Sequence, residues 1–317
     1  MRLFKKRNQK KRRPLQAKGV QFGYKNNQIF TNLKLTIQHN QIVAIVGQSG
    51  EGKSTFLHLA SGVMRKRYSG SIKIQGMGRR FSEKDVGFVP QEIALYQDLS
   101  IKDNIIACAG MNNIPPRESL KRAGELMELM QLNIPLDRCP KHLSGGQKVR
   151  LNIITSLLHN PKLLLLDEPF VGLDYKNRKI LWHFLKHLKR RKRTILLTTH
   201  MLVEAEHNTD RIILLKKGRV FASGKLKQLK QKLGAHYIME IKASNLSKKR
   251  MKEIENYCIT TDATIIDKYG TYIMFSILDG ATKTKLTRLF NRIGLDYEEL
   301  AYREPNLDEL FLKVGYI

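Results

Sequence analysis

The stretch Gly47-Gln48-Ser49-Gly50-Glu51-Gly52-Lys53-Ser54-Thr55 decides the fold of this chain, because it fits the pattern G-x-x-x-x-G-K-[ST]. Its glycines let the backbone curl so that successive N–H groups point inward, which makes a cradle for phosphate oxygens. The apolar run Ile42–Val46 precedes the loop, and a helical pattern from Lys53 to Ser61 follows it. A strand, a glycine-rich loop and a helix in this order are the context that a phosphate-binding loop needs, and they predict an α/β fold.

Two side chains of this loop have predicted tasks. Lys53 would reach the β- and γ-phosphates of a nucleotide, and Ser54 would hold Mg²⁺ through its hydroxyl. The positive end of the dipole of the following helix adds to the attraction for phosphate. A plain glycine-rich turn is the alternative, and the flanking strand and helix argue against it.

Two acidic residues follow a second apolar run. Leu163–Leu166 is fully apolar, which is typical of a parallel strand buried on both faces, and Asp167 and Glu168 come directly after it. Ligands of open α/β sheets bind at the carboxyl ends of the strands. We therefore expect Asp167 to hold Mg²⁺ through water and Glu168 to polarise an attacking water. Taken alone, such an acidic pair is also how many loops begin.

A second anion cradle is predicted at Leu143-Ser144-Gly145-Gly146-Gln147, which opens a helix that runs to about Leu158. A serine and two glycines at a helix N-terminus place N–H groups and a positive dipole end together. A chain with one phosphate loop binds one nucleotide, and a single nucleotide does not explain two anion-binding loops in one chain. We therefore expect the Ser144 loop to contact the γ-phosphate of a nucleotide held by another subunit.

The order of these motifs carries a family resemblance. GQSGEGKST, LSGGQ, LLLLDEP and a histidine at the end of a later strand together resemble the nucleotide-binding domain of ABC ATPases, over about residues 18–225. The resemblance implies a P-loop NTPase of ABC type, with a parallel-sheet core, an antiparallel β-subdomain and a helical insert at about residues 101–142. It also implies that the cofactors are ATP and Mg²⁺ and that the chain hydrolyses ATP.

Further residues match the family one by one. Tyr24 in FGYKNNQIF resembles the aromatic residue that stacks on adenine, with Phe22 as the fallback. Gln91 in VGFVPQE resembles the Q-loop glutamine, which contacts Mg²⁺ and water and senses the membrane subunit. His200 in TILLTTH resembles the switch histidine on the γ-phosphate. The D-loop Gly172-Leu173-Asp174 would couple two active sites.

The resemblance thus implies one composite site. Its catalytic residues would be Glu168, His200, Lys53 and Gln91, and its Mg²⁺ would lie at Ser54, Gln91 and Asp167. The ATP-binding residues would be Tyr24, Gly47, Gln48, Ser49, Gly50, Glu51, Gly52, Lys53, Ser54, Thr55, Ser144, Gly145, Gly146, Gln147 and Asp174. Two departures from the family pattern concern coupling across the interface and not hydrolysis. Phe170 and Val171 stand where small hydroxyl residues are common, and Val149 stands where a polar residue is usual.

The chain divides into three predicted parts. Residues 1–17 form a basic arm that we expect to be disordered, residues 18–233 the nucleotide-binding domain, and residues 234–317 a small α+β domain of order β-α-β-β-α-β. The ending Tyr302–Leu312 resembles that of drug-resistance-type exporter ATPases. An amphipathic helix capped by Asn306 is the alternative explanation of that ending.

Charge and hydropathy bear on the partners. The net charge of +29 lies in blocks such as Lys189–Arg193, which suit an anionic membrane surface or simply a solvated face. The blocks lack interleaved aromatic residues, which argues against a nucleic-acid partner. No apolar run approaches the roughly 20 residues of a membrane span, so we expect a separate transmembrane permease and a cytoplasmic chain attached peripherally through it.

The implied assembly also contains a second ABC ATPase subunit, either an identical copy or a paralogue. Two other functions stay open at this point. One is a soluble ABC ATPase that acts on nucleic acid or ribosomes, and the other is a regulator that binds ATP without hydrolysing it. Cys108, Cys139 and Cys258 show no metal-ligand spacing, and we expect three reduced thiols without a role.

Overall fold

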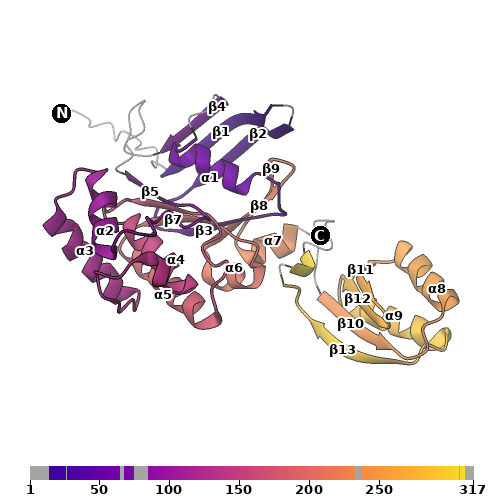
Figure 1. Ribbon diagram of the computed structural model, residues 1–317. Helices are drawn as coiled ribbons and strands as arrows, with labels where there is room; N and C mark the ends of the chain where they lie inside the picture. The colour runs from indigo at the N-terminus through magenta and orange to yellow at the C-terminus, as the bar shows by residue number, and fades with distance from the viewer. Residues whose placement is uncertain are drawn as a thin grey trace, which may run out of the picture. The chain divides into compact units, whose positions relative to one another are not determined.

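The computed structural model describes residues 14–25, 27–64, 68–74, 85–232, 237–306 and 308–310. The chain forms two compact units (Figure 1). Unit 1 comprises Met1–His200 and Asn208–Phe221, and unit 2 comprises Met201–His207 and Ala222–Ile317. None of the described helices is both long and apolar enough to cross a lipid bilayer.

Unit 1 begins with a three-stranded antiparallel sheet of order β2-β1-β4, formed by β1 (Leu15–Tyr24), β2 (Asn27–Ile37) and β4 (Ser69–Ile74). The start of β1 corrects the predicted boundary of the basic arm. Leu15 is fully buried and pairs with Ile37 and Ile74, so the strand begins three residues before position 18. Leu15 and Ala17 alternate with polar neighbours, which is the period of a strand with one buried face. Residues 1–13 of the arm lie outside the described residues.

A six-stranded sheet forms the centre of unit 1. Its order is β5 (Val86–Val89), β6 (Leu163–Leu166), β7 (Thr194–Thr198), β3 (Ile42–Val46), β8 (Arg211–Lys216) and β9 (Arg219–Gly224). The first five strands pair in parallel. Every residue of β3, β6 and β7 is buried, as predicted for β6 from its unbroken apolar run. The carboxyl ends of these three strands therefore lie side by side at one edge of the sheet.

Helix α1 (Lys53–Ser61) lies between the two sheets of unit 1 (Figure 1). Phe56 and Leu57 of α1 share one hydrophobic core with residues from both sheets, such as Phe30 on β2 and Val43 on β3. The helix that follows the phosphate loop is thus fixed on both sides, and so is the direction in which its N-terminus points.

The segment at residues 101–142 contains the predicted helical insert. It holds α2 (Ile101–Gly110) and α3 (Pro116–Leu129), followed by a non-helical stretch and a short 3₁₀ turn at Pro140–His142. Helix α4 (Gly145–Thr155) and helix α5 (Tyr175–Arg190) come next along the chain. Figure 1 shows α2 and α3 together at one end of unit 1.

Unit 2 contains two short helices, α6 (Leu202–Asn208) at its border and α7 (Leu226–Lys232), and a small α+β module. The module has an antiparallel sheet of order β11-β12-β10-β13, and its element order is the predicted β-α-β-β-α-β. Its elements are β10 (Tyr237–Ala243), α8 (Lys248–Ile259), β11 (Ala263–Tyr269), β12 (Tyr272–Ile277), α9 (Gly280–Arg292) and β13 (Tyr297–Arg303). Both helices pack on one face of the sheet, because residues of α8 and α9 share one core with β10 and β12.

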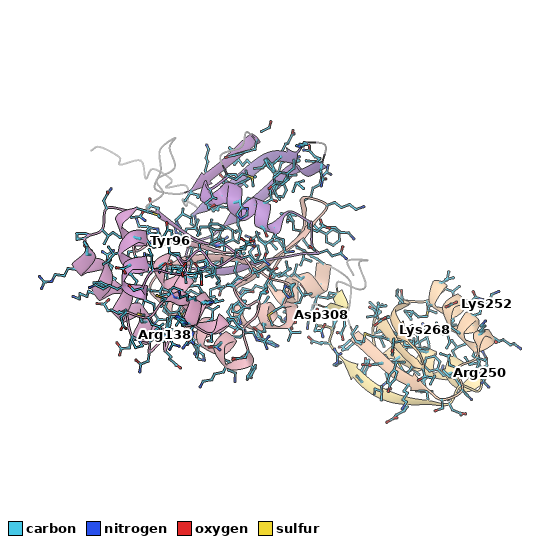
Figure 2. The ribbon with its side chains drawn as sticks, in the orientation of Figure 1. Tyr96, Arg138, Arg250, Lys252, Lys268 and Asp308 are labelled. Carbon is cyan, nitrogen blue, oxygen red and sulfur yellow. The ribbon has the colours of Figure 1, made fainter. Side chains whose placement is uncertain are left out.

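Arg250 connects two helices of the module. Arg250 and Lys252 lie on α8 and Lys268 on β11, as Figure 2 shows. Arg250 is not free in solvent, because its guanidinium donates to the carbonyl oxygens of Ile293 and Asn245 at 3.0 and 2.7 Å. This arginine therefore joins α8 to the end of α9.

The chain after β13 is held by a buried carboxylate. Glu309 is 4% exposed and accepts two hydrogen bonds from the guanidinium of Arg303. Glu309 also accepts from the backbone N–H of Asn306 at 2.8 Å, and its own N–H donates to the side chain of Asn306 at 3.0 Å. Asn306 and Glu309 thus form a reciprocal cap, as the structural explanation of this ending predicted. Leu307 and residues 311–317 lie outside the described residues.

We predict that Glu309→Ala lowers the stability of the module by about 1–3 kcal/mol, because it leaves the Arg303 guanidinium and the Asn306 N–H without their acceptor. Native-state hydrogen exchange of amides in β10 and β12 measures this free energy. Glu304→Ala is the matched control, since Glu304 pairs with Lys230 but its side chain is 72% exposed, and we expect a change below about 0.5 kcal/mol. Equal effects of the two substitutions would contradict the assignment.

Candidate nucleotide-binding site

The predicted phosphate loop connects β3 to α1, and Lys53 closes it. The Lys53 side chain donates to the carbonyl oxygens of Gly47 and Gln48 at 2.8 and 2.9 Å, and the residue is only 9% exposed. A buried ammonium group requires such acceptors, because an unpaired buried charge is costly. The loop is therefore held in a curled form by the same cation that would contact phosphates.

Glycine is required in this loop where the backbone turns. Gly52 has a φ of 95°, and a Cβ there would lie 2.6 Å from Ile29 and 2.7 Å from the ring of Phe30. The side chain of Glu51 is also engaged, because its carboxylate accepts the backbone N–H of Lys217 in the turn between β8 and β9. The loop is thus fixed against β2 on one side and the β8–β9 turn on the other.

Ser54 and Asp167 meet at the carboxyl ends of the parallel strands. The Ser54 hydroxyl donates to the Asp167 carboxylate at 3.0 Å, although the two residues are 113 positions apart. Asp167 is 2% exposed, and the Thr198 hydroxyl donates to the same carboxylate oxygen at 2.6 Å. A hydroxyl and a carboxylate at this distance are the hard oxygen donors that suit Mg²⁺. The two predicted metal ligands are therefore side by side.

Glu168 faces His200 across the ends of β6 and β7. The Glu168 carboxylate lies 3.0 Å from Nδ1 of His200 and 3.3 Å from the backbone nitrogen of His200, which donates to it. Glu168 has a φ of 45°, a left-handed conformation that costs a residue with a side chain about 1–2 kcal/mol. The His200 side chain is 65% exposed and the Glu168 side chain 11% exposed. The pair thus lies at the surface, with the carboxylate on the inner side.

The second predicted cradle is a helix N-terminus with a full capping box. The Ser144 side chain accepts the N–H of Gln147 at 3.3 Å, and the Gln147 side chain accepts the N–H of Ser144 at 2.9 Å. Ser144 and Gly145 are exposed, while Gly146 is buried, and a Cβ at Gly146 would lie 2.8 Å from the side chain of Asn177. The first turn of α4 therefore presents its N–H groups at the surface of the chain.

Arg150 ties this helix to the helical insert. Its guanidinium donates to the carbonyl oxygens of Gly146, Met130 and Gln131 at 3.2, 3.0 and 3.2 Å. Arg150 is 7% exposed, and this burial lowers its pKa. Arg150 thus connects the N-terminal part of α4 to the residues that directly follow α3. Arg150 was not among the predicted site residues, although an arginine within an otherwise apolar helical stretch is a signal for such a buried contact.

The predicted aromatic residues and Gln91 differ in how far they are exposed. Tyr24 is half-buried, its ring contacts that of Phe22 edge-on at 5.0 Å, and its hydroxyl lies 3.6 Å from the sulfur of Met64. Phe22 is 4% exposed, so Tyr24 is the better placed of the two aromatic rings for a ligand. Gln91 is exposed and follows β5 closely.

Asp174 is the N-cap of α5. Its carboxylate accepts the backbone N–H of Asn177 at 2.8 Å, and this bond lowers the pKa of Asp174. The stacking of Tyr24 on adenine and the coupling role of Asp174 stay predictions.

The structure adds Thr198, which the sequence analysis did not single out. Its hydroxyl accepts the backbone N–H of Glu168 at 2.9 Å in addition to its bond to Asp167. A hydroxyl residue at the end of the apolar strand TILLT is the signal that could have identified it.

The three thiols are half-buried and free. Burial raises the pKa of Cys108, and it raises the pKa of Cys258 to about 11. Both thiols are therefore protonated and unreactive near neutral pH.

Comparison with known proteins agrees with this geometry. Residues 30–171 match the family described as ABC transporter. The linearmycin resistance ATP-binding protein LnrL of Bacillus subtilis strain 168 is 29% identical over 313 residues, which cover 95% of this chain and 97% of LnrL. Human ATP-binding cassette sub-family A member 9 is 26% identical over 290 residues, which cover 90% of this chain but only 18% of that protein.

Solved structures share the fold of unit 1. The ATP-binding subunit of an ABC transporter is 29% identical and covers 69% of this chain and 93% of its own, with a TM-score of 0.63. A dimeric ATP-binding cassette in a post-hydrolysis state with ADP and phosphate is 28% identical and covers 67% of this chain and 98% of its own, with a TM-score of 0.60. Residues 30–171 therefore match the ABC transporter family, and the chain is similar over most of its length to ATP-binding and ATP-hydrolysing proteins of that family.

Proposed function

We propose that this chain powers a separate membrane permease by hydrolysing ATP at a site that it completes with a second ABC ATPase subunit. The observation that carries the proposal is the 3.0 Å contact between Ser54 and Asp167 beside the phosphate loop. It brings a hydroxyl, a carboxylate and the Lys53 ammonium to one edge of the sheet, where ligands of such sheets bind. Lys53 would then exchange its loop carbonyls for the phosphates of ATP.

Mg²⁺ fits between Ser54 and Asp167, with Gln91 as a further ligand, and it would neutralise charge on the β- and γ-phosphates. Glu168 would orient the attacking water and accept its proton, because its carboxylate lies at the inner side of the site. His200 would leave this carboxylate and donate to the γ-phosphate. Intact Glu168 and His200 in mutual contact support turnover over mere ATP binding.

A second subunit is proposed because the chain carries one phosphate loop and two anion cradles. Ser144 and Gly145 are exposed at the N-terminus of α4, where N–H groups and the helix dipole favour an anion. Two subunits placed head to tail would bring each Ser144 loop to the γ-phosphate on the other. The related cassette with ADP and phosphate is dimeric, which supports this arrangement. Whether the second subunit is a copy or a paralogue does not alter the geometry.

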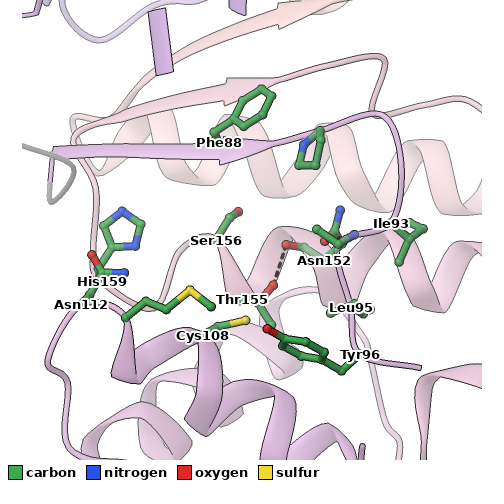
Figure 3. Close-up of a pocket in the computed structure, with 13 residues that line it drawn as sticks. Phe88, Ile93, Leu95, Tyr96, Cys108, Asn112, Asn152, Thr155, Ser156 and His159 are labelled. Carbon is green, nitrogen blue, oxygen red and sulfur yellow. Dashed lines mark hydrogen bonds between the residues drawn. The ribbon is translucent and has the colours of Figure 1, made fainter. Parts of the chain in front are cut away.

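The permease would dock in the groove that Figure 3 shows, whose lining includes Pro90, the residue before Gln91. The groove has a volume of about 530 Å³ and is lined by residues of the segment 88–96, the end of α2 and the C-terminal end of α4. Among the residues that the structure describes, its lining contains no lysine, arginine, aspartate or glutamate, in a chain with a net charge of +29. Tyr96 is 51% exposed and Met111 71% exposed at its rim. An uncharged groove with exposed apolar side chains fits the apolar end of a permease helix. Gln91 would sense this helix through its own binding to the nucleotide site.

We propose export as the direction of transport and a cytoplasmic location, attached to the membrane through the permease. The likeness to LnrL, whose name refers to resistance, supports export. With the start corrected to Leu15, residues 15–233 would act as the ATPase domain and residues 234–317 as an accessory domain. These relatives favour transport over the nucleic-acid alternative.

An anionic membrane surface is a further proposed partner, at the C-terminal end of α5. Arg190, Arg191 and Lys192 are exposed there, whereas Lys189 pairs with Asp210 and Arg193 donates to the Asn160 and Pro161 carbonyls. Each basic residue near anionic lipid contributes about 1 kcal/mol.

Mixing two inactive variants tests the shared site. Lys53→Ala removes the phosphate contact of one subunit, and Ser144→Arg blocks the cradle that it offers to the other. We expect each variant alone to lose more than about 90% of phosphate release. We expect an equal mixture to recover roughly a quarter of wild-type turnover, because half of the dimers then hold one intact site.

Glu168→Gln is the control for the chemistry, since it should stop phosphate release while ATP still binds and the dimer accumulates in size-exclusion chromatography. No recovery in the mixture, or undiminished turnover of Glu168→Gln, would argue against the proposal. If the chain pairs with a paralogue, the same substitutions are placed in the two different subunits.

The groove is tested by Met111→Glu and Tyr96→Asp. Both add a carboxylate to an uncharged surface, so we expect the permease to be lost from the purified complex and transport to fall at least tenfold. The ATPase activity of the isolated chain should stay within about twofold, because neither residue belongs to the nucleotide site. Leu129→Glu is the control at an exposed apolar residue outside the groove. Retained permease in both groove variants would reject this docking site.

A further inference from the structure

Thr198 occupies the last position of β7, at the centre of the nucleotide edge of the sheet. The residue is fully buried, and it lies two positions before His200. Its hydroxyl donates to the Asp167 carboxylate at 2.6 Å and accepts the backbone N–H of Glu168 at 2.9 Å. One hydroxyl group thus bridges two consecutive residues that have different proposed tasks.

The direction of these two bonds leaves the hydroxyl no other arrangement. A threonine hydroxyl has one proton to donate, and the Asp167 carboxylate oxygen accepts it. The backbone N–H of Glu168 can only donate, so it takes a lone pair of the same oxygen. The second donor to the Asp167 oxygen is Ser54, at 3.0 Å. Thr198 and Ser54 therefore hold the same carboxylate oxygen of Asp167, and Thr198 makes the shorter of the two hydrogen bonds.

The hydrogen bond from the Glu168 N–H to Thr198 stabilises an unfavourable backbone conformation of Glu168. Glu168 has a φ of 45°, a region that residues with side chains rarely occupy unless their surroundings hold them there. The Thr198 hydroxyl binds the N–H of this very peptide, and the Glu168 side chain then reaches His200 at 3.0 Å. Because β7 ends at Thr198 and His200 follows two residues later, one segment of the chain contacts both the backbone and the side chain of Glu168.

We propose that Thr198 is a positioning residue for hydrolysis: its hydroxyl holds the Glu168 peptide in the left-handed conformation that aims the carboxylate at the attacking water, and it orients the Asp167 carboxylate toward Mg²⁺. This inference rests on the proposed roles of Asp167 and Glu168. Thr198 touches neither nucleotide nor water in this account, so it acts on the chemical step and not on the binding of ATP.

Thr198→Val tests the hydroxyl, since valine has the same shape without the oxygen. We expect kcat for phosphate release to fall at least tenfold, while the Kd for a fluorescent ATP analogue changes less than threefold. We also expect the Mg²⁺ concentration for half-maximal turnover to rise at least threefold, because the Asp167 carboxylate loses its shortest hydrogen bond. Thr198→Ala removes the same hydroxyl and serves as the test if the valine variant does not fold.

Two matched variants separate positioning from packing. Thr198→Ser restores the hydroxyl without the methyl group, and we expect it to regain at least half of wild-type kcat. Thr194→Val removes a buried hydroxyl at the other end of the same strand, where it accepts the N–H of Asn40 at 3.1 Å. We expect this variant to lose thermal stability as Thr198→Val does but to keep kcat within twofold.

The outcomes distinguish this inference from the proposed function. Turnover of Thr198→Val within threefold of wild type, beside an inactive Glu168→Gln, would refute the positioning role alone. Equal losses in the valine and serine variants would assign Thr198 to packing and refute it as well. Undiminished turnover of Glu168→Gln would instead remove the proposed chemistry on which the inference rests.

Discussion

The structure of unit 1 depends on one convergence, in which three parallel strands end at the same edge and place their following residues within hydrogen-bond distance. Asp167 after β6, Thr198 at the end of β7 and Ser54 after the β3 loop meet around one carboxylate oxygen. A carboxylate that is 2% exposed must be hydrogen-bonded, because burial without partners would cost several kcal/mol. The apolar strands place Asp167 at the end of the sheet, and the hydroxyl groups of Ser54 and Thr198 stabilise its buried carboxylate through hydrogen bonds. The position of the site thus follows from the arrangement of the strands in the sheet.

Much of this arrangement could be predicted from the sequence, because its residues stand at the ends of strands with an unmistakable apolar pattern. Leu163–Leu166 is buried throughout, so the acids after it had to emerge at the sheet edge. The contacts among these residues could not be predicted. The bond between Thr198 and the Glu168 peptide depends on the register of β6 against β7, which pairs Leu166 with Leu197, and no local pattern fixes that register.

Errors of prediction arose where local composition competed with tertiary pairing. Leu15 follows a dense basic run, which is typical of a disordered tail, yet it is fully buried because β2 and β4 flank it with Ile37 and Ile74. Arg150 was not predicted as a buried contact, because no local pattern shows which carbonyl oxygens a helical arginine meets. Here the carbonyl oxygens of Met130 and Gln131, directly after α3, and of Gly146, within α4, accept its hydrogen bonds, so a buried cation connects the two helices.

The C-terminal ending shows how a motif can carry two meanings. Its glutamate and asparagine form a reciprocal cap, and Arg303 binds the same glutamate, so local stability alone is a sufficient reason for these residue types. A resemblance in this segment therefore argues for a shared module after the ATPase domain and carries little information on the direction of transport. The argument for export then depends on the extent of the likeness to LnrL, which spans 95% of this chain and includes both units. Specificity for the proposed permease would then come from surfaces such as the groove of Figure 3, whose lining, among the described residues, contains no lysine, arginine, aspartate or glutamate in a chain with a net charge of +29.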